Sequence, residues 1–96
     1  MDLGLKGKVA LVAGGSLGLG RAVAAELVRE GAQVAIGALD DSNLQEAVEF
    51  IQKKNEGEVL AVPADVSDPA QAGGFVHKAL EKFGTLDILV NNAGGP

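Results

Sequence analysis

The stretch from Ala13 to Arg21 reads AGGSLGLGR and places Gly14, Gly18 and Gly20 in a G-x-x-x-G-x-G spacing. An apolar run precedes it and a segment of helical periodicity follows, so the glycines lie between a predicted strand and a predicted helix. Without side chains in the way, backbone N–H groups and the positive end of the helix can approach a phosphate closely. We therefore predict a loop that binds the pyrophosphate of a dinucleotide.

Two other chemistries do not fit this loop. A loop that binds a nucleoside triphosphate ends in Gly-Lys-Ser/Thr, and no such sequence follows Gly20. A methyltransferase that binds S-adenosylmethionine on a similar sheet needs an acidic residue before a differently spaced glycine loop. A glycine-rich turn that serves packing alone is a further alternative, but the strand and helix around the loop favour the dinucleotide.

Four short apolar runs alternate with three segments of helical periodicity, which predicts an α/β fold with a parallel sheet and right-handed crossovers. The strand order that follows most naturally is 3-2-1-4, a truncated, doubly wound Rossmann-type sheet with three crossover helices. In this order the winding direction changes between strands 1 and 4, and ligands of such sheets bind there, beyond the carboxyl ends of the strands. We expect strands at residues 8–13, 33–37, 59–62 and 86–90, and helices at residues 19–30, 42–51 and 69–83.

Polar residues mark the expected helix starts. Ser42 and Gln45 form a capping-box pattern, in which a side chain at the first position and one three residues later satisfy each other's backbone N–H groups. Asp68 and Gln71 form the same pattern around a proline at the first helical position. Gly84 is expected to end the third helix.

Composition narrows the possible partners. The chain has 96 residues and a net charge of −5, with 3 Phe and no Tyr or Trp, so we do not expect it to bind nucleic acid. It has no Cys and a single His, which excludes disulfides and gives no metal site. We interpret His77 as an exposed helix residue and Asp87 as a turn or capping residue at the wrong end of the sheet for chemistry.

No apolar run approaches the roughly 18 residues of a membrane span, and the first eight residues carry no hydrophobic signal core. The sequence therefore predicts a soluble, cytoplasmic protein that does not associate with membranes.

Three motifs together resemble the short-chain dehydrogenases/reductases. This family has a T-G-x-x-x-G-x-G loop and a fourth strand that ends in N-N-A-G, and the chain has the glycine loop and Asn91-Asn92-Ala93-Gly94, with an Asp65-Val66 pair after the third strand. The resemblance covers essentially all 96 residues. It implies that Asp65-Val66 holds the adenine edge, that the loop holds the phosphates and ribose, and that the segment after strand four lies beside the cofactor. The implied cofactor-binding residues are Gly14, Ser16, Leu17, Gly18, Leu19, Gly20, Ala38, Asp65, Val66, Asn92, Ala93 and Gly94.

Two positions depart from the family pattern. Ala13 replaces the usual Thr, whose hydroxyl would tie the loop toward strand four. Ala38 stands where an acidic residue normally binds the adenosine ribose, or a basic residue a 2′-phosphate. Asp40 and Asp41 follow with no Lys or Arg near them, and their charge would repel a 2′-phosphate, so between NAD and NADP we favour NAD. Alternatively, these two acids are simply solvated next to a helix start, where the helix dipole stabilises them.

The chemistry that the resemblance implies is hydride transfer between a nicotinamide and a small carbonyl or alcohol substrate. The catalytic Ser and the Tyr-x-x-x-Lys pair of the family come after N-N-A-G, and this chain contains no Tyr. We therefore expect no catalytic residue here, and interpret residues 1–96 as one NAD(P)-binding domain, the amino-terminal part of a longer enzyme. If the chain truly ends at Pro96, an inactive nucleotide-binding or assembly module is the alternative.

The resemblance also suggests a likeness to 3-oxoacyl-carrier-protein reductases, from the A-G-G-P ending and the general character of the chain. It implies a homo-oligomer, either a dimer or a tetramer, for the full-length protein.

Overall fold

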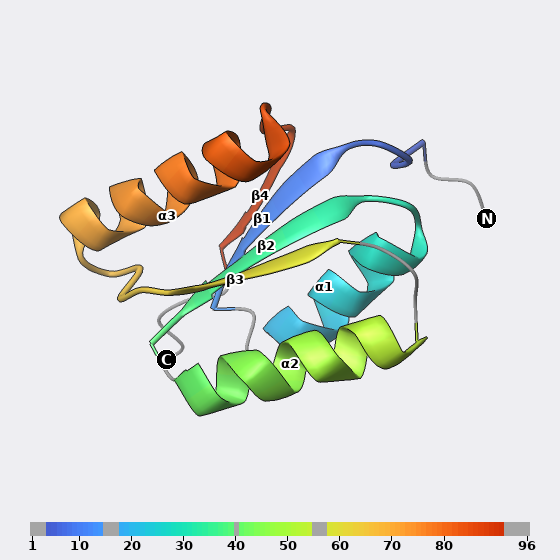
Figure 1. Ribbon diagram of the computed structural model, residues 1–96, viewed down its shortest axis with the longest axis horizontal. Coiled ribbons are helices and arrows are strands. Elements are labelled where there is room, and N and C mark those ends of the chain that lie inside the picture. The colour runs from blue at the N-terminus through green and yellow to red at the C-terminus, as the bar shows by residue number, and fades with distance from the viewer. Residues whose placement is uncertain (1–3, 15–17, 40, 55–57, 92–96) are drawn as a thin grey trace.

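The computed structural model describes residues 4–14, 18–39, 41–54 and 58–91. Strands and helices alternate along the chain, and the strands form one parallel sheet of order β3-β2-β1-β4 (Figure 1). This confirms the predicted fold class and strand order. The elements are β1 (Val9–Ala13), α1 (Gly18–Arg29), β2 (Gln33–Ala38), α2 (Asp41–Lys54), β3 (Val59–Pro63), α3 (Pro69–Phe83) and β4 (Ile88–Asn91).

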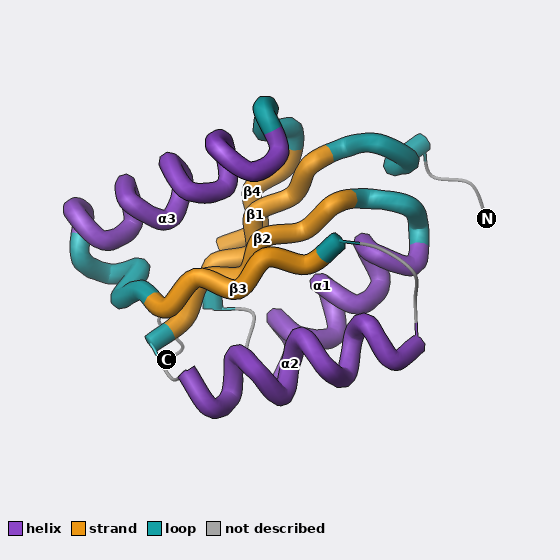
Figure 2. Tube along the Cα trace, in the orientation of Figure 1, coloured by secondary structure: helices purple, strands orange, loops and turns teal. Residues whose placement is uncertain are grey.

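The sheet is covered by helices on both faces, with α1 and α2 on one face and α3 on the other (Figure 2). All of β1 is buried, with side chains between 0% and 8% exposed, because this strand lies in the middle of the sheet between two helical layers. Ala10 and Val12 pack toward α1 and α2, whereas Val9 and Leu11 pack toward α3. Burial on both faces explains why the strand is an unbroken apolar run rather than an alternating pattern.

The strand register brings the carboxyl ends of the central strands together. Ala13 at the end of β1 is paired with Gly37 of β2 on one side and with Asn91 of β4 on the other. Ala38 at the end of β2 is paired with Pro63 at the end of β3. The loops after these strands therefore leave from one edge of the sheet, as the strand order predicted.

The fourth strand is shorter than expected, since β4 begins at Ile88 rather than at residue 86. Asp87 closes the start of the ladder instead: its backbone N–H donates to the Val9 carbonyl, and its carboxylate Oδ2 accepts from the Val9 N–H, each at 2.9 Å. Asp87 thus has a structural role, as expected: its two hydrogen bonds to Val9 join the starts of β1 and β4, away from the carboxyl edge. We call this pair of bonds the clamp.

The predicted helix starts are partly wrong. Helix α2 begins at Asp41, so Ser42 lies inside the helix and is not its cap. At α3 the cap is Asp68, whose side chain accepts from the Ala70 N–H at 3.1 Å, and Gly84 ends the helix in the left-handed conformation, both as predicted. The capping box itself is incomplete, because the Gln71 side-chain oxygen accepts from the Asp65 N–H rather than from the Asp68 N–H.

Strand β4 lies at one edge of the sheet, and apolar side chains near it are open to solvent. Leu89 in the strand is 64% exposed, and Leu80 on α3 is 41% exposed. No residue of β4 is fully buried, so it is the least covered of the described strands. A parallel sheet is ordinarily covered on both faces.

Candidate dinucleotide-binding site

The turn between β1 and α1 is shaped by glycine backbones. Gly14 directly follows β1 with φ at +83°, and its N–H donates to the Gly37 carbonyl at 2.6 Å. Gly18, the first residue of α1, has φ at +57°, and a Cβ built there would meet no other described part of the chain within 4 Å, apart from its own neighbours and helix turn. A side chain at either position would strain the backbone, because L residues with a Cβ rarely adopt such φ values. The bond from Gly14 to β2 also ties the loop to the sheet, although Ala13 lacks the hydroxyl usual in the family.

The amino end of α1 lies by the carboxyl edge of the sheet (Figure 1). Helix α1 is 12 residues long, and Gly20, Ala24 and Val28 form its buried stripe against the core. Leu19 lies on the other side, 70% exposed. The start of such a helix attracts anions through its unsatisfied N–H groups and its dipole. Ser16 and Leu17, also predicted to bind the cofactor, lie outside the described residues.

The end of β2 carries no charged side chain in the described residues. Ala38 is 8% exposed, and its carbonyl accepts from the Ala64 N–H at 2.8 Å, which joins the ends of β2 and β3. Leu39 follows and is 70% exposed. Asp40 lies outside the described residues, and of Asp41 only the backbone, at the start of α2, is described.

The turn after β3 is held by side chains. The Asp65 carboxylate accepts from the Ser67 hydroxyl at 2.5 Å and from the Ser67 N–H at 3.0 Å. These two bonds lower the pKa of Asp65 below its usual range, and the bond from the hydroxyl has the larger effect. The Asp65 N–H donates to the Gln71 side chain at 2.8 Å, and the Asp65 carbonyl accepts from the Asp68 N–H at 3.0 Å. Asp65 is therefore an ionised, fixed acceptor at the carboxyl edge.

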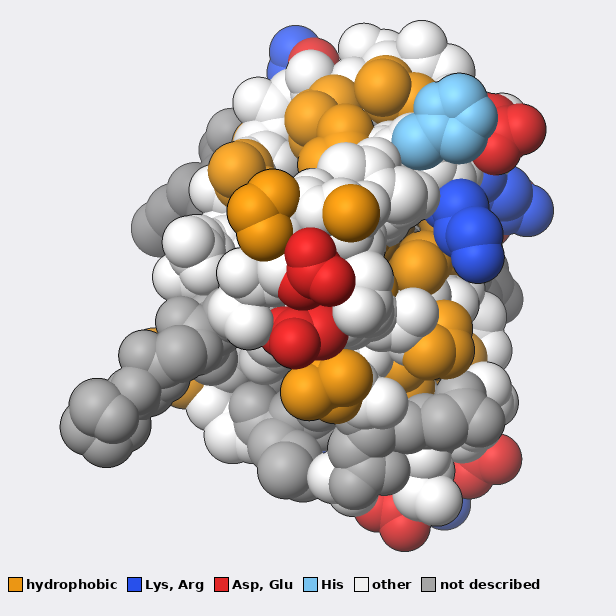
Figure 3. Space-filling model, turned by 90° about the vertical axis from the view of Figure 1, so that its left-hand side faces the viewer, with side chains coloured by type: hydrophobic (Ala, Val, Ile, Leu, Met, Phe, Trp, Pro, Cys, Tyr) orange, Lys and Arg blue, Asp and Glu red, His pale blue; other side chains and the backbone are white. Residues whose placement is uncertain are grey.

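A hollow of about 150 Å³ lies beside this turn, between the ends of β1 and β4 and helix α3. It is smaller than a complete site for a drug-sized ligand, so it can hold only part of a dinucleotide. Its walls are mostly apolar. Figure 3 shows the face of the molecule at the carboxyl edge of the sheet, where hydrophobic side chains lie around a pair of acidic ones. The lining residues are Ala13, Val66, Ala72, Phe75, Val76, Leu89 and Asn91.

The structure thus brings the described site residues to one edge of the sheet. Gly14, Gly18, Leu19 and Gly20 come from the first turn, Ala38 from the second, and Asp65 and Val66 from the third. Asn92, Ala93 and Gly94 lie outside the described residues, although β4 directs the chain toward the same edge.

One close approach behind this edge was not predicted from the sequence. A Cβ on Gly37 would lie 2.9 Å from two ring carbons of Phe75, which is 3% exposed. Gly37 therefore lets α3 pack tightly on β2. A glycine at the end of an apolar strand was the available signal, because glycine in a strand often marks such an approach. The role of Ser67 was not predicted either, although a serine two residues after an aspartate is typical of a turn closed by side-chain hydrogen bonds.

The remaining candidate residues lie away from the site. His77 is exposed on α3, as predicted, with its Nε2 atom 3.4 Å from Oε1 of Glu81. Among the described residues, no group of three His, Cys, Asp or Glu side chains is placed to hold a metal ion. In the same part of the chain, no helix combines the length and the apolar character needed to cross a membrane.

Comparisons with known proteins agree with this geometry. Residues 8–96 match the family model described as short chain dehydrogenase. The chain is 46% identical over 89 residues to the short chain dehydrogenase/reductase dpmpG of Macrophomina phaseolina, covering 93% of this chain and 51% of that protein. It is 45% identical over 91 residues to an L-rhamnose 1-dehydrogenase (NAD(P)(+)) of a Sphingomonas species, covering 94% of this chain and 35% of that one.

Among solved structures, the L-sorbose reductase of Gluconobacter frateurii, complexed with NADPH and L-sorbose, superposes with a TM-score of 0.93 at 40% identity. The match covers 99% of this chain and 36% of that one. The chain thus spans about half, or less, of the length of these relatives. Since the family model covers nearly the whole chain and the structural match is close, the chain belongs to the short-chain dehydrogenase/reductase family.

Proposed function

We propose that this chain is the dinucleotide-binding segment of an NAD(P)-dependent oxidoreductase that interconverts a small carbonyl compound and its alcohol. The observation that carries the proposal is the glycine turn at Gly14, which leads from the central strand into the amino end of α1 at the carboxyl edge of the sheet. The family membership supports the same reaction type. The relatives carry the names of dehydrogenases and reductases, so an inactive module is not favoured.

The described residues fit a dinucleotide. The amino end of α1 supplies N–H groups for a pyrophosphate, and Gly18 places no side chain beside them. Asp65 supplies an ionised acceptor, and the apolar hollow beside it suits one face of an aromatic ring. When bound, the nicotinamide supplies or takes up the hydride. The task of the chain's own residues is to hold the two ends of the cofactor at fixed points along the sheet edge.

We assign no catalytic role to any residue of this chain. The 96 residues contain no Tyr, and the resemblance places the catalytic Ser, Tyr and Lys after the N-N-A-G segment. We infer that the proton for the carbonyl oxygen is handled by residues that this sequence does not include.

For the cofactor, we propose NAD over NADP. Positions 38 to 41 include two aspartates and no Lys or Arg, so a 2′-phosphate would meet negative charge and no basic partner. The related L-sorbose reductase was solved with NADPH, so the two cofactors must be compared directly. Fluorescence titration with NADH and NADPH is the measurement, and tighter binding of NADPH would contradict this choice.

The substrate, the assembly and the location belong to the same proposal. Relatives named for L-rhamnose and L-sorbose support a small hydroxylated carbonyl compound as the substrate class. The family resemblance supports a homo-oligomer, which light scattering of the protein would measure. Cell fractionation would test the cytoplasmic location.

A substitution in the glycine turn tests the proposed binding site. Gly14→Val should weaken NADH binding by roughly 10-fold or more, because a β-branched residue strains the left-handed backbone and turns N–H groups away from the phosphates. Titration of the NADH fluorescence measures the dissociation constant. The matched control is Gly73→Val on α3, where the added side chain meets open space. Equal affinity in both variants would contradict the assignment of the loop.

A further inference from the structure

The Asp65 carboxylate is held through one of its two oxygens. Both donors of Ser67, the hydroxyl and the N–H, bond to Oδ1, at 2.5 and 3.0 Å. The other oxygen, Oδ2, receives neither of these bonds. Two donors on one oxygen fix the rotation of a carboxylate, so the direction of Oδ2 is fixed as well.

Gln71 holds the backbone of the same residue. Its side-chain oxygen accepts from the Asp65 N–H at 2.8 Å, and its side-chain nitrogen donates to Oδ2 of Asp68 at 3.2 Å. The other oxygen of Asp68 accepts from the Ala70 N–H and caps α3. Gln71 therefore connects Asp65 to the first turn of the helix, which itself is packed on the sheet through Phe75.

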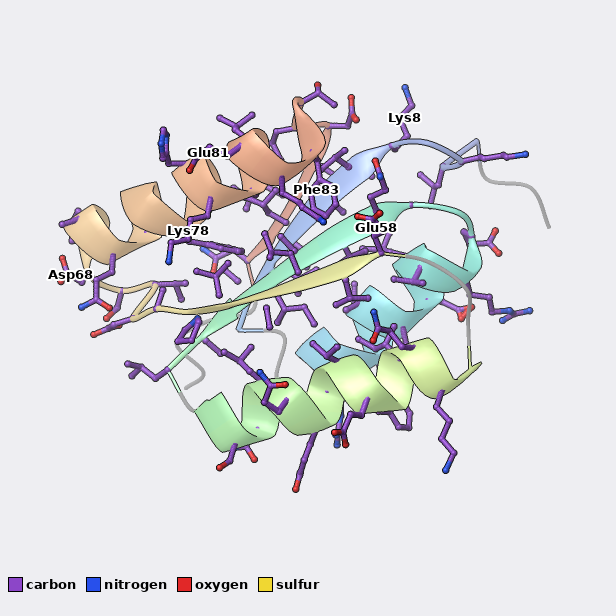
Figure 4. All side chains as sticks on the ribbon, in the orientation of Figure 1. Lys8, Glu58, Asp68, Lys78, Glu81 and Phe83 are labelled. Atoms are coloured by element: carbon purple, nitrogen blue, oxygen red, sulfur yellow. The ribbon has the colours of Figure 1, made fainter. Side chains whose placement is uncertain are left out.

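This arrangement is more than the helix start needs. The cap at Asp68 and the proline after it suffice to begin α3, and both of the Ser67 bonds described here go to Asp65 rather than to the helix. Both Ser67 bonds and one of the two Gln71 bonds end on Asp65, whereas the other Gln71 bond goes to the cap residue Asp68. Figure 4 shows Asp68 at the end of α3 that lies by the carboxyl edge, with Phe83 at the opposite end, so this network lies on the side of the predicted cofactor.

We propose that Ser67 and Gln71 are positioning residues, which preset the free direction of the Asp65 carboxylate for the 6-amino group of a purine. The inference rests on the proposed dinucleotide function. An ionised carboxylate only accepts hydrogen bonds, and the 6-amino group of adenine only donates them. Hypoxanthine carries a carbonyl oxygen at the same position, which cannot donate and is repelled by the carboxylate. Preset geometry increases the difference between the two bases, since a rotating carboxylate would adapt to either.

The test compares two cofactors that differ only at this position. NADH and nicotinamide hypoxanthine dinucleotide, in its reduced form, are titrated against the protein, and the ratio of the two dissociation constants is the readout. For the wild type we expect a ratio on the order of 10 in favour of adenine, the worth of one hydrogen bond to a charged group. Ser67→Ala and Gln71→Met should reduce the ratio to about 3 or less, as expected for a loosely held acceptor.

Two controls separate positioning from general damage. Ser67→Thr retains the hydroxyl and should keep the wild-type ratio. Gln52→Met makes the same substitution on the exposed face of α2, far along the chain from Asp65, and should change nothing. Circular dichroism and thermal unfolding establish that each variant is folded. If Gln71→Met does not fold, the exposed Ser67→Ala variant decides the question by itself.

Three results would contradict the inference, and one of them would also contradict the proposed function. If Ser67→Ala and Gln71→Met weaken both cofactors equally and leave the ratio unchanged, the two residues have only a structural role. If the wild type binds both cofactors equally, Asp65 does not select the amino group. If the wild type binds neither NADH nor NADPH, the proposed function itself is wrong, and the inference with it.

Discussion

The turn after β1 and the turn after β3 lie at the same edge of the sheet, yet different groups hold them. The first depends on backbone conformations that only glycine adopts easily, at Gly14 and Gly18. The second depends on side chains, with Ser67, Gln71 and Asp68 bonded around Asp65. In the proposed site, the first turn would make room for a phosphate by leaving side chains out, whereas the second uses side chains to fix an acceptor. The two ends of the site should therefore respond differently to substitution and to pH.

The largest effect should come from Gly37, which contacts the first turn and the helix α3 that follows the second turn. Its carbonyl accepts from Gly14, and its Cα faces the ring of Phe75. Gly37→Ala should lower the free energy of unfolding by about 1–3 kcal/mol, because the new methyl group would lie 2.9 Å from buried ring atoms. Urea denaturation measures this change.

A second substitution shows whether the ring is the cause. In a Phe75→Leu background, the same Gly37→Ala change should cost less, since the smaller side chain can yield. An equal cost in both backgrounds would place the strain in the β2 backbone instead.

A smaller effect is expected at the cap of the second turn. Asp68→Ala should lower the free energy of unfolding by about 1 kcal/mol, because the Ala70 N–H loses its acceptor and the Gln71 amide loses a partner. Asp68→Asn keeps an acceptor at the cap and serves as the control, with most of the stability retained. Thermal unfolding of the two variants side by side is the measurement, and equal losses would indicate that charge rather than capping matters.

The smallest expected effect is a pH response confined to the second turn. The pKa of Asp65 is lower in the folded chain because the Ser67 hydroxyl and N–H bond to its carboxylate. Its contribution to stability is therefore complete above the pKa of the unfolded state and is lost as the pH falls through the folded value. Ser67→Ala should move the midpoint for Asp65 to higher pH, as followed by NMR of the carboxyl carbon. A midpoint that stays in place would show that Ser67 does not set it.

Much of the fold was predictable because it depends on patterns that are local in the sequence. Apolar runs buried on both faces identify the strands, and the glycine spacing identifies the loop before α1. The errors occurred at the ends of elements, and at β4 a tertiary contact overrides the local pattern. Ser42 and Gln45 resemble a capping box, but α2 begins one residue earlier. The sequence predicts a strand from residue 86, but Asp87 bonds to Val9 and β4 begins only at Ile88.

The candidate site was predictable only in part, for a related reason. The glycine positions could be predicted from the sequence because few other residues tolerate their backbone conformations. The partners of Asp65 could not be predicted, because serine and glutamine are common on any protein surface. Only the folded turn shows that both residues bond to Asp65. Gln71 was assigned to the cap by its spacing, whereas in the structure its side-chain oxygen accepts from Asp65 instead.

The clamp between Val9 and Asp87 also has a consequence for the order of folding. The two residues are 78 positions apart, and the central strand β1 receives its second neighbour only from the last strand of the described chain. Contacts of such long range must wait until most of the chain is available, which slows folding. During synthesis, the side of β1 that pairs with β4 therefore stays unpaired until residues 88–91 have left the ribosome, and an unpaired strand edge of this kind is prone to aggregation.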